Sequence, residues 1–137
     1  YLDLQWFNKR ASRLPEALWF SFHPVAVDGA WWIEKMGSEI SPLEVVENGN
    51  RHLHASGKYV TYREPGVCFT ISALDSPLVA PGQRSLLDFN NRQPEMREGV
   101  HFCLYNNLWG TNFPMWFEED CRFRFILDLS TQPEDQK

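Results

Sequence analysis

Residues 121–129 have the sequence CRFRFILDL, and this stretch decides the fold class. Its apolar side chains all share one parity, at Cys121, Phe123, Phe125, Leu127 and Leu129. Most of the residues of the other parity are charged, namely Arg122, Arg124 and Asp128. Because the side chains of a β-strand alternate between its two faces, the stretch is predicted to be a strand with one buried face and one solvated face.

The same period of two recurs at residues 18–22, 67–73 and 100–106, and shorter strand candidates lie at residues 31–36 and 58–63. Both faces of residues 100–106 are fairly apolar, so that strand is expected in the middle of a sheet. Turn-forming clusters separate these stretches, at residues 27–29, 47–50, 64–66, 80–82 and 97–99. The only helix signal is a single turn at residues 41–46. The pattern predicts an all-β fold, an antiparallel β-sandwich.

The chain of 137 residues has the size of one domain and contains no internal repeat or linker-like change of composition. Residues 1–129 are therefore expected to form a single β-sandwich domain. Residues 130–137 are polar, include Pro133 and lack apolar periodicity, which predicts a flexible C-terminal tail.

Composition and charge argue against two classes of partner. The 13 Lys plus Arg and 18 Asp plus Glu give a net charge of −5 with scattered arginines, so no nucleic-acid partner is expected. No stretch approaches the roughly 20 apolar residues of a membrane-spanning helix, so no membrane partner is expected. The three cysteines have no Cys-x-x-Cys spacing and are expected to be free thiols, which together with the lack of a signal peptide favours a cytoplasmic location.

The residue types that usually perform catalysis or bind metals form no recognisable group. His52 and His54 would share one face of an extended segment, but a zinc site needs further ligands and none follows at a typical spacing. The carboxylates at residues 118–120 and at Asp75 are of the type that a glycosidase uses in pairs. A run of three acids directly before a strand is, however, typical of a solvated turn. We therefore predict no catalytic residue and no metal ligand.

Residues 105–117 have the sequence YNNLWGTNFPMWF, which combines aromatic rings with side-chain amides. Aromatic faces stack on the apolar faces of sugar rings, and Asn amides match hydroxyl groups as both donors and acceptors. The segment is therefore a candidate carbohydrate-binding loop, with the contacts assigned to Trp109, Trp116, Asn106, Asn107 and Asn112. The alternative is that its aromatic rings close the end of the sandwich.

Four motifs resemble an uncharacterised family of proteins similar to glycoside hydrolase family 38, the α-mannosidase family. They are RLPEALW (residues 13–19), HLH (52–54), LDSPLVAPG (74–82) and YNNLWGTNFP (105–114). The motifs occur in order, and the resemblance covers residues 5–129. It corresponds to the C-terminal β part of that architecture, a sandwich of the galactose-mutarotase-like, mannosidase C-terminal type.

The resemblance implies that a preceding (β/α)-type domain would carry zinc, an aspartate nucleophile and an acid/base carboxylate. This chain lacks the alternating strand and helix pattern of such a domain, so no catalytic or zinc-binding residue is assigned to it. Zinc is expected only in the missing catalytic domain, and no cofactor is expected in this chain.

Two functional hypotheses follow. The first is a C-terminal β-sandwich portion of an α-mannosidase-like glycoside hydrolase, which supports carbohydrate binding and hydrolysis by the absent catalytic domain. The alternative is a stand-alone β-sandwich that binds carbohydrate or protein and performs no catalysis. The expected partners are carbohydrate and either the parent catalytic domain or a second copy of this chain, because the aromatic-rich surface suits an interface.

Overall fold

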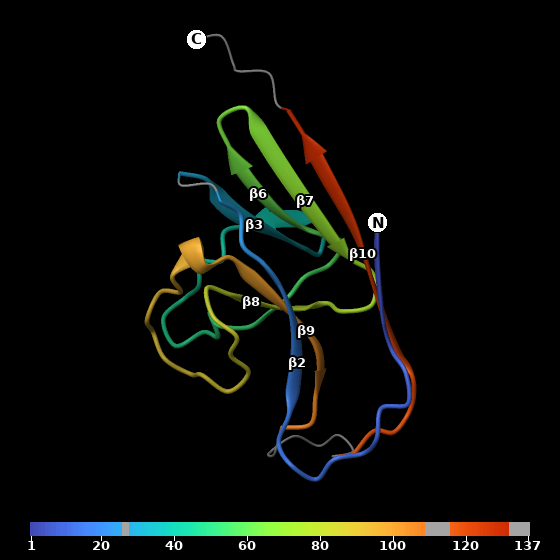
Figure 1. Cartoon of the computed structure of the whole chain (residues 1–137). Helices are drawn as coiled ribbons and strands as arrows, with labels where there is room; N and C mark the ends of the chain where they lie inside the picture. The colour runs from blue at the N-terminus through green and yellow to red at the C-terminus, as the bar shows by residue number, and fades with distance from the viewer. Residues whose placement is uncertain (26–27, 109–115, 132–137) are drawn as a thin grey trace.

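The computed structural model describes residues 1–25, 28–108 and 116–131, and in them the chain forms two antiparallel β-sheets (Figure 1). The larger sheet has the strand order β1 (Leu2–Trp6), β10 (Cys121–Ser130), β7 (Val67–Ala73), β6 (Val60–Glu64), β3 (Ala30–Lys35) and β4 (Ser38–Ile40). The smaller sheet has the order β2 (Ala17–Phe22), β9 (Val100–Asn106), β8 (Leu78–Pro81) and β5 (His54–Ala55). The described residues include one short 3₁₀-helix, η1 (Met96–Glu98), and no α-helix. The all-β antiparallel prediction is confirmed.

The two sheets pack against each other through an aromatic core. Phe125 on β10 is fully buried, and its ring lies 5.2 Å from Phe20, 5.8 Å from Phe22 and 5.4 Å from Phe102. Because these three partners belong to β2 and β9, the contacts join the larger sheet to the smaller one. The arrangement is sandwich-like, as the alternating apolar residues of both sheets predict.

The strands that decided the fold class lie where the sequence predicts them. β10 carries its buried Phe125 on the predicted parity, while Arg122 and Ile126 on the other parity are exposed. β9 lies between β2 and β8, which confirms the prediction that residues 100–106 form a central strand. Trp31 is buried in the core and its neighbour Trp32 is only half-buried, as expected for adjacent residues of a strand.

The turn predicted at residues 80–82 is wrong in its first two residues. Ala80 and Pro81 belong to strand β8, where they pair with His101 and Val100, and the chain turns only at Gly82. A proline is tolerated there because the pairing of β8 with β5 covers only Leu78 and Val79, so at Pro81 that side of the strand is an unpaired edge. Both residues are buried, so packing outweighs the turn preference of the Ala-Pro-Gly sequence.

Two further predictions lie partly outside the described residues. The predicted turn at 27–29 includes residue 27, and the predicted tail at 130–137 includes residues 132–137, and the structure does not describe either.

Residues 41–46 form one turn, closed by the N–H of Glu44 donating to the carbonyl oxygen of Ser41, and do not continue as a helix. The described part of the chain has no helix with the length and apolar character needed to cross a bilayer.

Candidate functional site

The predicted carbohydrate-binding loop begins where β9 ends. Trp109 and Asn112 lie outside the described residues. Asn106 is the last residue of β9, half-buried, and its Nδ2 lies 3.7 Å from the Cys103 Sγ. Trp116 is 48% exposed, with the Arg13 guanidinium 4.7 Å from its ring. Within the described part of the loop, Trp116 therefore presents an exposed indole with the arginine over one of its faces.

Asn107 is buried, and its side chain hydrogen-bonds the backbone of residues 12–16, the segment that precedes β2. Its Oδ1 accepts a hydrogen bond from the N–H of Glu16 (2.6 Å), and its Nδ2 donates to the carbonyl oxygens of Ser12 and Leu14 (3.1 Å each). Arg13, which stacks on Trp116, belongs to the same segment, so the structure brings Asn107 and Trp116 together through residues 12–16. The side-chain amide of Asn107 is engaged within the chain.

We expect Asn107→Asp to lower the free energy of unfolding by about 2 kcal/mol, because a carboxylate would face the carbonyl oxygens of Ser12 and Leu14 and leave both unpaired. Urea unfolding of the purified variant measures this loss. The matched control is Asn106→Asp, whose side chain makes one weak contact with sulfur. Equal unfolding midpoints for the two variants would contradict the fastening role.

A buried lysine occupies the space beside this segment. Lys9 is 2% exposed, and its Nζ lies 2.7 Å from Oε1 of Glu16 and 3.0 Å from the carbonyl oxygen of Arg10. The rings of Tyr105 and Trp6 lie 4.4 and 5.1 Å from the ammonium group. A charge in this position is compensated by one carboxylate and two aromatic faces. The contacts around Asn107 and Lys9 therefore act mainly to hold the end of the sandwich together.

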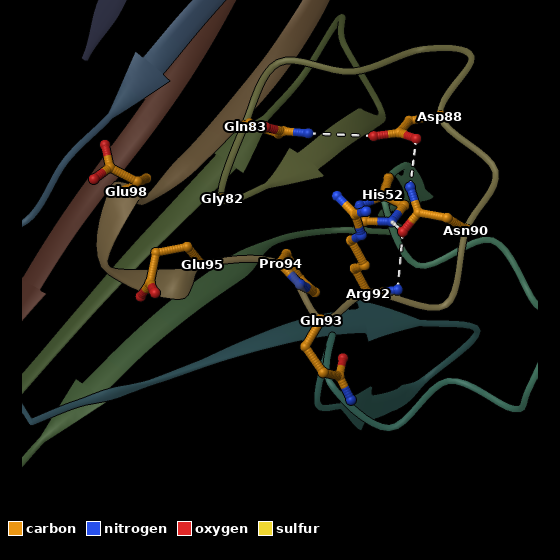
Figure 2. A pocket seen from close by; sticks show the side chains of 10 residues that line it. All are labelled: His52, Gly82, Gln83, Asp88, Asn90, Arg92, Gln93, Pro94, Glu95 and Glu98. Atoms are coloured by element: carbon orange, nitrogen blue, oxygen red, sulfur yellow. Dashed lines mark hydrogen bonds between the residues drawn. The ribbon is translucent and has the colours of Figure 1, made fainter.

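The opposite end of β9 carries a polar hollow that the sequence analysis did not identify. It has a volume of about 270 Å³, and its wall is formed by residues 82–83, 88, 90, 92–95 and 98, with His52 at the side (Figure 2). Most of the wall comes from the segment between β8 and β9. Because β9 has seven residues, this hollow lies about 20 Å from the predicted loop.

The side chain of Asn90 is fixed at the centre of a hydrogen-bond chain in this hollow. Its Nδ2 donates to Oδ1 of Asp88 (2.5 Å), and its Oδ1 accepts from the backbone N–H of Arg92 (2.8 Å). The same Oδ1 lies 3.2 Å from Nε2 of His52, and Gln83 donates to the other oxygen of Asp88 (3.3 Å) (Figure 2). Since Asn90 Oδ1 is an acceptor, this network assigns the proton of His52 to Nε2.

A second hollow adjoins the first and shares Asn90 with it. It has a volume of about 220 Å³ and is lined by Asn48, Gly49, Asn50, Phe89, Asn90 and Asn91. The loops on its two sides are tied together, because Asn48 and Asn91 exchange hydrogen bonds of 2.8 and 3.0 Å. The ring of Phe89 is 74% exposed among these amides. The second hollow thus places an aromatic face beside several amide groups.

The chain matches no protein-family model, no curated protein and no solved structure.

The chemistry that the two hollows offer is hydrogen bonding to a polar ligand. The first provides carboxylate acceptors, amide groups that both donate and accept, and the guanidinium of Arg92. Among the described residues, no three His, Cys, Asp or Glu side chains lie close enough together to hold a metal ion. The hydrogen-bond donors and acceptors of the wall match the hydroxyl groups of a polar ligand.

The two histidines of the HLH motif lie in different environments. His52 and His54 are both buried, but His52 contacts Asn90 whereas His54 contacts Lys35 and the carbonyl oxygen of Arg51. Burial and the nearby charge of Lys35 lower the pKa of His54 to about 4, so its imidazole is neutral at pH 7.

The other candidate carboxylates and the three cysteines line neither hollow. Both oxygens of Asp75 bind Arg124 at 2.8 and 2.9 Å, and this guanidinium lowers the pKa of the carboxyl group. Residues 118–120 are exposed, and Asp120 accepts a hydrogen bond from the N–H of Asn8. Cys68, Cys103 and Cys121 are free, as expected.

The signal for the hollows was present in the sequence. Residues 88–93 have the sequence DFNNRQ, in which a phenylalanine lies among amide and charged side chains. This is the same combination of ring and amides that made residues 105–117 a candidate. In the sequence, residues 47–52 show only a turn cluster and a histidine pair, and nothing in the sequence indicates that this loop lies beside residues 88–93.

Proposed function

We propose that this chain is a non-catalytic carbohydrate-binding domain and that the two hollows around Asn90 hold the sugar. The observation that carries the proposal is the fixed Asn90 amide, which lies between a polar hollow and the exposed ring of Phe89. Sugar rings combine hydroxyl groups with apolar C–H faces, and this site offers partners for both. A volume of about 270 Å³ lies just below the range of about 300–1,000 Å³ for ligand pockets, which suits one or two sugar units.

We further propose that the chain is the β-sandwich portion of an α-mannosidase-like glycoside hydrolase, of the galactose-mutarotase-like type. The four ordered motifs support this assignment, and the sandwich-like antiparallel architecture agrees with it. In this role the domain would present a glycan to a catalytic domain that lies outside this chain. The alternative is a stand-alone binding domain with the same site.

Titration with a panel of manno-, gluco- and galacto-oligosaccharides by isothermal calorimetry tests the site. We expect dissociation constants between about 10 μM and 1 mM, as for an open site with one aromatic face and a few hydrogen bonds. Phe89→Ala removes the stacking surface and is expected to weaken binding by about tenfold.

The matched control is Leu87→Ala, because Leu87 is also exposed in the same segment but lines neither hollow. No heat of binding with any member of the panel at millimolar sugar, or equal binding by the Phe89 variant and the wild type, would contradict the proposed site. Turnover of an aryl α-mannoside by the purified chain would contradict the non-catalytic role while leaving the binding site intact.

A further inference from the structure

Strand β1 is an open edge of the larger sheet. Among the residues that the structure describes, β1 pairs only with β10, so its other side has no strand partner. Edge strands commonly carry a lysine, a proline or a β-bulge, which discourage the addition of another strand. β1 has the sequence LDLQW and pairs with β10 without a shift of register, so it has none of these. Its one charged side chain, Asp3, binds Arg122 through both carboxylate oxygens, at 2.6 and 3.0 Å.

The backbone groups that face the open side of β1 belong to Asp3 and Gln5. Arg124 lies opposite Asp3 on β10. The N–H of Arg124 donates to Asp75 and its carbonyl oxygen accepts from the N–H of Leu74, so both groups point toward the β7 side. Because opposite residues of an antiparallel pair either bond each other or both face away, the N–H and C=O of Asp3 point away from β10. Those of Gln5, two residues further along the strand, point the same way.

The apolar face of β1 borders a groove between the two sheets. The groove has a volume of about 310 Å³, and Leu4 and Trp6 line it from β1. Leu18 and Phe20 line it from β2, which is an edge strand of the smaller sheet. A strand that extended the larger sheet beyond β1 would turn every second side chain toward this groove. An apolar strand therefore fits the edge better than a polar one.

We propose that a second copy of this chain occupies this edge, with β1 of each copy paired antiparallel about a two-fold axis at Leu4. In this register Asp3 of one copy lies opposite Gln5 of the other, and Leu2 lies opposite Trp6. The outward backbone groups of the two strands hydrogen-bond each other, and the two larger sheets become one. The interface is independent of the proposed sugar site, because none of residues 2–6 lines either hollow.

The side chains of β1 are complementary to themselves in this register. The carboxylate of Asp3 faces the amide of Gln5, which can donate to it, while the apolar side chains of both strands share the inward face. Other antiparallel registers that bring the outward backbone groups together move the axis to Asp3 or to Gln5. An axis at Asp3 places like charges opposite each other and pairs only residues 2–4, and an axis at Gln5 pairs only residues 4–6 of β1. The axis at Leu4 alone pairs the whole strand.

Sedimentation equilibrium of the purified chain measures this association. Between about 5 and 500 μM we expect the mass to rise from that of the monomer toward twice that value. Gln5→Asp places two carboxylates opposite each other at both symmetric positions and is expected to weaken the dimer by about tenfold. In the wild type, NMR should show slower hydrogen exchange of the Asp3 and Gln5 amides at the higher concentration, a readout that needs no variant.

Two variants serve as controls for charge. The double variant Asp3→Asn/Gln5→Asp exchanges the acid and the amide, keeps the net charge of −5 and should restore wild-type dimerisation. Met36→Asp adds the same charge as Gln5→Asp at an exposed turn between β3 and β4, at the far end of the sheet, and should leave the dimer unchanged. A monomer at every concentration would overturn the second copy as the occupant. Equal dimerisation by wild type and Gln5→Asp, equal weakening by Met36→Asp, or no recovery in the double variant would overturn the register and with it the proposal.

Discussion

We expect Gly99→Ala to lower the free energy of unfolding by about 3 kcal/mol or more. Gly99 has φ = 82° and ψ = −151°, a conformation that a residue with a side chain adopts only at a cost of about 1–3 kcal/mol. An added Cβ would also overlap with the backbone oxygen of Phe22 and lie 3.0 Å from its carbonyl carbon. Because this neighbour is backbone in the β2–β9 pairing, the strain cannot be relieved by moving a side chain.

Gly37→Ala is the matched control for this experiment. Gly37 also has a positive φ, 88°, but a Cβ there would meet no atom within 4 Å. We expect a loss of about 1 kcal/mol from the backbone conformation alone. Chemical unfolding followed by tryptophan fluorescence measures both variants, and equal losses at the two positions would show that the contact with Phe22 is unimportant.

Phe125→Ala is expected to lower the free energy of unfolding by about 3–5 kcal/mol. The ring is fully buried and contacts three phenylalanines of the other sheet, so its removal leaves a cavity at the centre of the core. Since domains of this size are stable by about 5–15 kcal/mol, the variant should unfold at a much lower urea concentration.

The next residue provides the control, because Ile126 is 46% exposed on the opposite face of β10. Ile126→Ala should cost about 1 kcal/mol or less, mainly through lost strand preference. Comparable losses for the two variants would mean that residues 121–129 do not divide into a core face and a solvent face.

The long strands were predictable because one of their two faces is buried, which makes apolar and polar residues alternate along the sequence. Very short strands, and strands whose partner is far away in the sequence, were not predictable. β4 and β5 contain three and two residues, too few for a period to be detected. Leu2, Leu4 and Trp6 do alternate in β1, but its pairing with β10 joins residues more than 100 positions apart and is set by tertiary packing.

The candidate site was less predictable than the fold for a related reason. Sequence identified a combination of aromatic and amide groups at residues 105–117, yet side-chain chemistry alone does not say which partners the amides bind. In the structure the Asn107 amide binds the backbone of the segment before β2, whereas the amides around Phe89 bind one another and nearby backbone groups, and they bring together two loops about 40 residues apart in the chain. Loop proximity of this kind depends on how β5, β8 and β9 pair.

The two sheets end in four edge strands of very different length. β4 and β5 are short on one side, whereas β1 and β2, with five and six residues, border an apolar groove on the other. Exposed edges with apolar side chains are where polypeptides recruit further strands and begin to form fibrils, and short edges resist this. We therefore expect strand-to-strand association between copies of this chain, where it occurs, at β1 and β2, and charged substitutions on these two strands to reduce aggregation at high protein concentration.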